Sequence, residues 1–152
     1  MGNDTIFGMD DDDTIDGGQD DDWIDAGIDD DLVTGNVGND TITGGDGADT
    51  LTGGAGADTF VYRSLREAGD TITDFVPGTD RLHLGALLAS LGYTGTQPLA
   101  DGYLKLVSTP AGTSVQIDAD GSAGSAVARP LVLLKGVAAS SLDAARDIIV
   151  AP

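Results

Sequence analysis

The chain has 152 residues, enough for one ordinary domain or for a block of repeats with a cap. It contains no cysteine, which excludes disulfides and thiolate metal sites, and its 26 acidic residues against 7 basic ones give a formal net charge of −19. Such a charge repels nucleic acid and anionic membranes and attracts cations, and no apolar run approaches the ~20 residues of a membrane span.

The negative charge is concentrated in the N-terminal part of the chain. Residues 1–61 carry 17 Asp and no Glu, Lys or Arg, whereas residues 62–152 hold 9 acids and 7 bases. A segment this acidic and this poor in aromatic side chains should be disordered unless a cation neutralises it. No N-terminal signal peptide is visible, and the sequence opens partway through a repeat unit, which predicts that the natural protein is longer.

A period of nine residues runs through residues 1–61. Six complete units follow a partial one, and two positions of the unit keep one kind of residue throughout. Position six is always aspartate: Asp4, Asp13, Asp22, Asp31, Asp40, Asp49 and Asp58. Position eight is always apolar: Ile6, Ile15, Ile24, Val33, Ile42, Leu51 and Phe60. A disordered acidic linker would not keep two such columns in phase, so we do not favour that alternative.

Each unit is typical of a turn followed by a short strand. Gly and Asp at positions one to six favour a turn, and positions seven to nine, such as Thr41–Thr43, favour a strand with one inward side chain. Two units make one coil, so alternate units stack about 4.8 Å apart. The position-six carboxylates then form two rows whose members repel by about 1 kcal/mol per pair in water. A hard cation that binds carboxylate and carbonyl oxygens, calcium above all, would reverse that balance.

These units resemble the GGxGxDxUx nonapeptide of RTX proteins, and Gly44–Thr52 and Gly53–Val61 match it in full. The resemblance implies an all-β fold, a right-handed parallel β-roll with about five calcium ions between successive turns on the same side. The implied pairs are Asp4 with Asp22, Asp13 with Asp31, Asp22 with Asp40, Asp31 with Asp49, and Asp40 with Asp58. Backbone carbonyls at positions two and four would complete the sites: Asp11, Gly18, Asp20, Gly27, Asp29, Asn36, Gly38, Gly45, Gly47, Gly54 and Gly56.

Some units depart from this pattern. Position four is aspartate at Asp11, Asp20 and Asp29, and because aspartate tolerates left-handed backbone we expect the turn to survive. These extra carboxylates either enlarge the calcium sites or face water while only their carbonyls matter, and we favour the second interpretation. Glycine is also lost at Met9, Ala26 and Asn36, which predicts less regular coils toward the N-terminus.

After Val61 the nine-residue period stops, so we place a roll at residues 1–61 and a cap with a secretion-signal region at residues 62–152. Candidate strands are Phe60–Arg63, Asp70–Phe75, Arg81–Leu84, Tyr103–Ser108, Thr113–Asp118, Leu131–Lys135 and Asp147–Val150. Leu87–Leu91 and Leu142–Arg146 could form short helices, the second capped by Ser140 or Ser141. This pattern predicts a β-sandwich-like cap with one or two short helices that closes the open end of the roll.

Asp70–Phe75 and Pro77–Leu82 resemble the DxIxDFxxGxDxL stretch that follows the repeats of RTX proteins. That stretch occurs in serralysin-type proteases, alginate epimerase modules and the C-terminal targeting domains of large type I secreted adhesins and toxins. Val115–Gly121, Leu131–Val137 and Asp147–Val150 look most like the last group. This resemblance implies export by a type I secretion machinery, with an uncleaved signal near the C-terminus within Leu142–Pro152.

Four further aspartates are candidate calcium ligands. Asp70 and Asp74 could complete a site where roll and cap meet, although both equally suit turn or cap positions. Asp118 and Asp120 resemble half of a DxDxS/G calcium loop, but no bidentate acid follows, so an acidic hairpin turn is the better interpretation.

Nothing in the sequence indicates catalysis. His83 is the only histidine, lies in an alternating stretch without a partner, and suits a packing role. No GxSxG or HExxH frame is present, so we expect no catalytic residue. Trp23 is expected to face outward, where it could stack on a sugar, but a lone aromatic on a β-face needs no ligand.

We therefore expect a non-enzymatic, calcium-binding module at the C-terminus of a type I secreted protein, located outside the cell or at its surface. Cytosolic calcium lies below the ~10⁻⁴–10⁻³ M affinities of extracellular modules, so the module should fold only after export. The alternative is a carbohydrate-binding accessory module of an extracellular polysaccharide-modifying enzyme, against which the charge of −19 argues. An ice-binding solenoid would need a Thr/Asn array that position three lacks. The open N-terminal end of the roll offers an edge through which two chains could associate.

Overall fold

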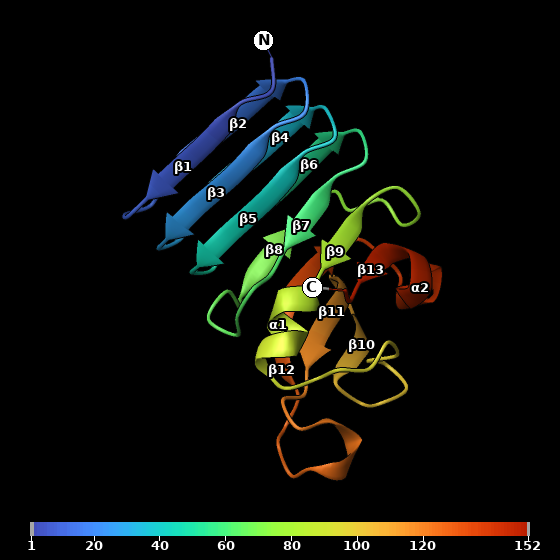
Figure 1. Cartoon of the computed structure of the whole chain (residues 1–152). Coiled ribbons are helices and arrows are strands. Elements are labelled where there is room, and N and C mark those ends of the chain that lie inside the picture. Colours follow the sequence, from blue (N-terminus) through green and yellow to red (C-terminus); the bar gives the residue numbers. More distant parts are fainter. Residues whose placement is uncertain (1, 152) are drawn as a thin grey trace.

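The first part of the chain forms a roll of two parallel β-sheets (Figure 1). The structure is a computed structural model and describes residues 2–151, so Met1 of the partial repeat and Pro152 of the expected export signal lie outside the described residues. Strands alternate between the sheets along the chain. One sheet contains β1 (Thr5–Met9), β3 (Trp23–Ile28) and β5 (Thr41–Asp46), and the other contains β2 (Thr14–Gln19), β4 (Leu32–Val37) and β6 (Thr50–Ala55).

Every neighbouring pair of roll strands is offset by one coil of eighteen residues. Ile24 lies beside Ile42, and Val33 lies beside Leu51. Position-eight side chains point into the roll and are almost completely buried from Ile24 onward. The same offset holds between β1 and β3, so the prediction of less regular N-terminal coils was wrong. Left-handed backbone at non-glycine residues, such as Asp11 with φ 76°, preserves the turns there.

The strands are also longer than the predicted three residues. β5, for example, continues from Thr41–Thr43 through the next three residues to Asp46. The backbone keeps pairing there, with Gly27 beside Gly45, because glycine lets neighbouring coils approach closely. Positions one to three therefore belong to strands, and the turn is confined to positions four to six.

The two ladders of the roll continue past the last nonapeptide. β7 (Thr59–Val61), β8 (Asp70–Ile72) and β9 (Arg81–His83) add another coil, because β8 pairs with β6 and β9 pairs with β7. The pairs are now Thr50 with Thr71 and Thr59 with Arg81, so the offset has grown beyond eighteen residues. Longer loops hide this coil from the nine-residue period. The proposed division at residue 61 stays a prediction.

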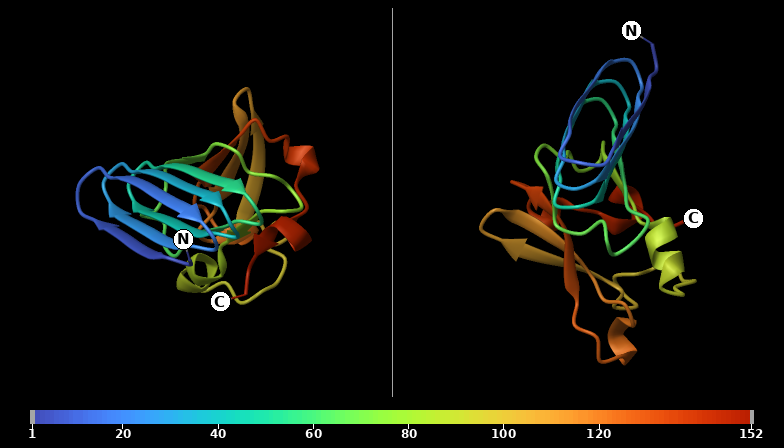
Figure 2. Two further views of the ribbon diagram at one scale, coloured as in Figure 1. Left: turned by 90° about the horizontal axis from the view of Figure 1, so that it is seen from above. Right: turned by 90° about the vertical axis from the view of Figure 1, so that its left-hand side faces the viewer.

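The cap extends both sheets of the roll (Figure 2). The antiparallel strands β10 (Leu104–Thr109), β11 (Gly112–Ile117) and β12 (Arg129–Lys135) join β8 through a parallel pairing of β12. The short strand β13 (Ile148–Ile149) pairs with β9 in the other sheet. In the right-hand view of Figure 2 the roll is a stack of flattened coils, and the cap lies at the end opposite the N-terminus. The predicted all-β roll with a C-terminal cap is confirmed.

Two short helices lie in the cap, α1 (Gly85–Ser90) and α2 (Ala144–Asp147), together with single 3-10 turns at Gly121–Ala123 and Ala139–Ser141. The predicted serine cap of the second helix was wrong. Asp143 is the N-cap, and its Oδ1 accepts a hydrogen bond from Ala145 N at 3.0 Å. Over residues 2–151 no helix has the length and apolar character that crossing a membrane would require.

Candidate calcium sites

The position-six aspartates form two columns along the turns of the roll. In the first column, the backbone N–H of Asp4 donates to Asp22 Oδ1 at 2.7 Å, and that of Asp22 donates to Asp40 Oδ1 at 2.8 Å. The backbone N–H of Asp40 likewise donates to Asp58 Oδ1 at 3.0 Å. The second column contains Asp13, Asp31 and Asp49, linked in the same way at 2.8 and 2.9 Å. The structure thus brings the predicted aspartates together in the predicted order.

Six of the seven column carboxylates have one oxygen without a hydrogen-bond partner. This Oδ2 atom is buried without a donor within the described part of the chain at Asp13, Asp22, Asp31, Asp40, Asp49 and Asp58. At the last five of these, Oδ1 accepts a hydrogen bond from the backbone N–H of the aspartate one coil earlier. A buried carboxylate oxygen without a partner is costly unless a cation lies beside it. The columns therefore fit a bound cation.

The glycine at position one gives this free oxygen its space. A Cβ added at Gly17 would lie 2.8 Å from Asp22 Oδ2 and 2.9 Å from the carbonyl oxygen of Gly35. A Cβ at Gly35 or Gly53 would overlap the carboxylate of its own unit in the same way. The first glycine of the repeat thus leaves room for the carboxylate, which turns back over it.

Backbone carbonyls also line the space between stacked turns. A Cβ at Gly45 would overlap the carbonyl oxygen of Gly27 one coil earlier, and a Cβ at Gly56 would overlap that of Gly38. Positions two and four are mostly left-handed, including Asp20 with φ 78°. Among residues 2–151, no three His, Cys, Asp or Glu side chains cluster as a metal site, so a cation here would rely on backbone oxygens. An environment of carboxylate and carbonyl oxygens suits calcium.

The extra carboxylates at position four face outward. Asp20 Oδ2 accepts a hydrogen bond from Gly2 N at 2.7 Å, and Asp29 Oδ2 accepts one from Asp11 N at 3.2 Å; all three aspartates of this kind are exposed. This geometry supports the interpretation that only the carbonyls of these residues serve the calcium sites. The side chains of Asp20 and Asp29 instead tie neighbouring coils together.

Burial and mutual repulsion raise the pKa values of several column carboxylates. Desolvation raises the pKa of Asp31 and Asp40, and it raises the pKa of Asp49 and Asp58 to about 6. Neighbouring carboxylates raise these pKa values further, while backbone hydrogen bonds lower them. In the described chain no Lys, Arg or His forms an ion pair with a column aspartate. The negative charge of the columns is therefore not balanced by the protein itself.

Comparison with known proteins identifies the family. A sequence profile of the RTX calcium-binding nonapeptide repeat, with four copies, matches residues 1–33 and 25–60. The solved AlgE6R3 subunit from the Azotobacter vinelandii mannuronan C5-epimerase is 30% identical, with a TM-score of 0.67, over 91% of this chain and 79% of that chain. The chain belongs to the RTX calcium-binding repeat family. The AlgE6R2 subunit from the same enzyme is 28% identical, with a TM-score of 0.63, over 97% of this RTX chain and 92% of that chain. Curated protein sequences gave no significant match.

RTX repeats bind calcium, and the buried, unpartnered carboxylate oxygens of this RTX roll fit that ion. Six column aspartates have such an oxygen, while Asp4, at the N-terminal end of the first column, is exposed. The assignment of individual residues to individual ions stays a prediction.

The columns of the RTX roll continue into the cap. Asp70 follows Asp49 in the second column, and its Oδ1 accepts Asp49 N at 3.0 Å. Asp80, which was not among the residues expected in the columns, follows Asp58 in the first column, and its Oδ1 accepts a hydrogen bond from Asp58 N at 3.1 Å. Its signal was the spacing of Gly78, Asp80 and Leu82, which repeats positions four, six and eight of the unit. Asp74 lies outside the columns and instead accepts the backbone N–H groups of residues 53 and 54 at 3.0 and 2.8 Å.

The candidate loop at Asp118 and Asp120 is held by protein groups. Asp118 Oδ2 accepts a hydrogen bond from Lys105 Nζ at 2.8 Å, and this contact lowers the pKa of Asp118. Asp120 accepts the backbone N–H groups of Ser125 and Ala126 within its own loop. This arrangement supports the acidic hairpin turn.

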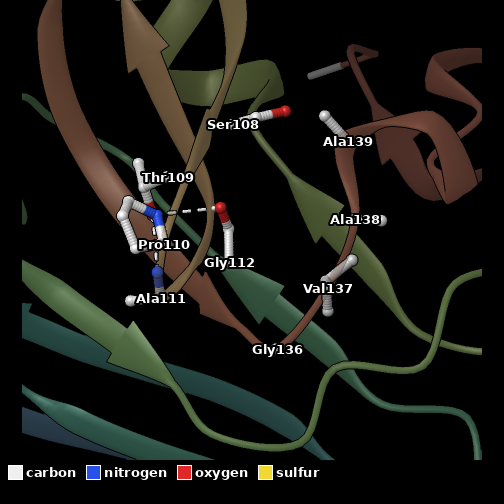
Figure 3. A pocket seen from close by; sticks show the side chains of 9 residues that line it. All are labelled: Ser108, Thr109, Pro110, Ala111, Gly112, Gly136, Val137, Ala138 and Ala139. Carbon is white, nitrogen blue, oxygen red and sulfur yellow. Dashed lines mark hydrogen bonds between the residues drawn. The ribbon is translucent and has the colours of Figure 1, made fainter.

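Features outside the columns offer little chemistry. The pocket between the β10–β11 hairpin and residues 136–139 is lined by Ser108, Thr109, Pro110, Ala111, Gly112, Gly136, Val137, Ala138 and Ala139 (Figure 3). None of these nine side chains is ionisable at neutral pH. His83 is half-buried on β9, and Trp23 is half-buried with its ring edge-to-face against Phe7 at a centroid distance of 5.2 Å.

The raised pKa values predict that calcium binding weakens in acid. Asp49 and Asp58 have pKa values of about 6, and burial raises the pKa of Asp70 to about 7. Because these folded-state values lie above the unfolded ones, the calcium-free roll is stabilised below the ordinary carboxyl pKa, and this stability is lost as the pH rises through about 6 to 7. Protons compete with calcium for the same oxygens of the folded roll, so at a given free calcium concentration less calcium should be bound at about pH 5.5 than at about pH 7.5.

Equilibrium dialysis against buffered calcium at the two pH values, at constant ionic strength, measures the calcium bound per chain. Proton release on calcium addition at intermediate pH provides an independent reading. Equal amounts of bound calcium at both pH values would contradict the assignment of these carboxylates to the binding sites.

Proposed function

We propose that this RTX module is the calcium-folded C-terminal part of a type I secreted protein, unfolded at cytosolic calcium and folded outside the cell. The observation that carries the proposal is the set of buried column carboxylates whose Oδ2 atoms have no partner in the described chain. Without a cation these charges must be desolvated unpaired or protonated, and both states oppose the folded roll at neutral pH.

The basic residues of the cap do not remove this problem. Arg63 binds Asp25 at 3.0 Å and Arg66 approaches Asp46 at 3.9 Å, but both arginines come after the nonapeptides and contact aspartates outside the columns. Exposed pairs of this kind contribute little to stability. A cation between the turns has to supply the remaining neutralisation, which links folding to the calcium concentration.

Folding would also restrict access to the expected export signal. Asp147 in this segment is completely buried, and its Oδ1 accepts the backbone N–H of Gly78 at 2.9 Å. Arg146 forms an ion pair with the same carboxylate at 2.7 Å. Recognition of residues 142–152 by a secretion machinery would therefore favour the unfolded, calcium-free chain.

Calcium removal tests the proposal directly. In excess EGTA the chain should lose most of the strand signal in its circular dichroism spectrum and expand, and ~1 mM calcium should restore both. Sodium chloride at matched ionic strength and an equal concentration of magnesium are the controls, because they separate calcium binding from charge screening and from the binding of any divalent ion. Equal strand content with EGTA and with calcium would overturn the proposal.

A second candidate is a carbohydrate-binding accessory role. It is supported by the similarity to two subunits of a mannuronan C5-epimerase and by the partly exposed pair of Phe7 and Trp23. The strongly acidic roll argues against direct binding of an anionic polymer. Titration of mannuronan oligomers into the calcium-loaded chain and its Trp23→Ala variant separates the two candidates.

A further inference from the structure

The two aspartate columns end differently in the cap. Asp80 is the last aspartate of the first column, and both of its carboxylate oxygens accept hydrogen bonds. Oδ1 accepts one from the backbone N–H of Asp58 at 3.1 Å, and Oδ2 accepts one from the backbone N–H of Val76 at 2.7 Å. Asp70 ends the second column with only Oδ1 satisfied, by Asp49 N at 3.0 Å. Its Oδ2 is buried without a hydrogen-bond partner among residues 2–151, and Asp70 is only 1% exposed.

The Asp49–Asp70 pair repeats the arrangement of the nonapeptide pairs. Asp49 N donates to Asp70 Oδ1 as Asp31 N donates to Asp49 Oδ1, at 3.0 and 2.9 Å. Both Asp49 and Asp70 keep a free, buried Oδ2, as two successive aspartates of one column do inside the roll. The pair is thus equivalent to an internal column pair, although its members lie 21 residues apart.

Further oxygens surround this pair. The carbonyl oxygen of Gly47 would lie 3.5 Å from a Cβ at Gly69, so it faces the loop that leads into Asp70. The Tyr62 hydroxyl is buried without a hydrogen-bond partner in the described chain, and its pKa is raised by burial and by the adjacent Asp70 carboxylate. Both atoms are neutral oxygens of the kind that calcium accepts.

We propose that Asp49 and Asp70 hold a calcium ion at the junction of roll and cap, a site that the nonapeptide spacing does not contain, whereas the Asp58–Asp80 pair holds none. The inference rests on the column aspartates being the calcium ligands. In the Asp58–Asp80 pair the Val76 N–H occupies the oxygen that a cation would need, so the first column is closed by a hydrogen bond.

The junction site would couple the cap to calcium. Asp70 lies in β8, opposite Val132 of β12, and Gly69 N donates to the carbonyl oxygen of Leu131 at 2.9 Å. β12 in turn pairs with β11, so an ion beside Asp70 would fix the strand on which the three antiparallel strands of the cap are assembled.

Two matched substitutions test the site. Asp70→Asn and Asp80→Asn each remove one charge at the end of a column and keep an oxygen for the backbone N–H of Asp49 or Asp58. Calcium stoichiometry, by native mass spectrometry of the calcium-loaded chain, should fall by one ion in Asp70→Asn and stay unchanged in Asp80→Asn. An unchanged count in Asp70→Asn, or the loss of an ion in Asp80→Asn, would overturn the proposal.

A second measurement covers the outcome in which Asp70→Asn does not fold. In a Trp23→Phe chain, terbium bound in place of calcium should show emission sensitised by tyrosine. The double variant Trp23→Phe, Tyr62→Phe should lose a large part of this emission. Unchanged emission places no ion beside Tyr62 and overturns the site. A wild-type chain that folds equally with EGTA would instead overturn calcium-dependent folding, so the two failures are distinguishable.

Discussion

Replacing Gly45 by alanine should destabilise the calcium-loaded roll by about 4 kcal/mol or more, enough to prevent folding at moderate calcium concentrations. Gly45 has φ +110°, and a Cβ there would overlap the backbone carbonyl oxygen of Gly27 in the preceding coil. That carbonyl cannot move away alone, because Gly27 and Gly45 are paired in the ladder of β3 and β5. The calcium midpoint by circular dichroism and the melting temperature in saturating calcium measure the loss.

Gly18→Ala is the matched control for this substitution. Gly18 occupies the same position of its unit, with φ +106°, but a Cβ there meets nothing within 4 Å. This variant should therefore be destabilised only by the backbone strain of alanine at positive φ, about 1–2 kcal/mol. Both variants keep the backbone carbonyl that is predicted to bind calcium. Equal destabilisation of the two would contradict the close stacking of coils as the reason for glycine at position two.

Asp40→Asn should have the second large effect, because Asp40 belongs to two predicted calcium pairs, with Asp22 and with Asp58. Its Oδ1 accepts Asp22 N at 2.8 Å, its own N–H donates to Asp58 Oδ1 at 3.0 Å, and its Oδ2 is buried and unpartnered. Asparagine can keep the first hydrogen bond but removes the charge that both ions need. We expect the calcium midpoint to rise about tenfold or more and the stoichiometry to fall by up to two ions.

Asp12→Asn makes the same change of charge at the surface of the roll. Asp12 is exposed and its Oδ1 accepts Asp30 N at 3.1 Å, an interaction that asparagine can also make. Its calcium midpoint and stoichiometry should stay close to wild type. If Asp12→Asn weakened calcium binding as much as Asp40→Asn, general acidity rather than the columns would control binding.

Local repetition made the roll predictable. A two-residue alternation of strand side chains and a nine-residue spacing of aspartates are both visible in the sequence, and stacking identical units leaves only one register. Asp22, Asp40 and Asp58 therefore lie where the period predicts. The tolerance of aspartate for left-handed backbone likewise predicted the turns at Asp20 and Asp29, with φ 78° at both.

Sequence spacing was less informative where the loops change length. The pairs of Asp49 with Asp70 and of Asp58 with Asp80 are 21 and 22 residues apart, so the eighteen-residue period does not show them. Asp70 was still found as a candidate through its motif, but its place in the second column was not. Asp143 was missed as the cap of α2 because the preceding serines are equally good capping residues by type.

The sequence by itself determined the coiled architecture, the two columns and their suitability for a cation, because each follows from short-range repetition and from uncompensated charge. The tertiary structure alone decided how the columns end. A buried oxygen is satisfied or left free according to which backbone N–H lies beside it, and Val76 reaches Asp80 whereas no donor in the described chain reaches Asp70 Oδ2. That difference depends on how the loops of the last coil pack against the cap, which residue spacing does not encode.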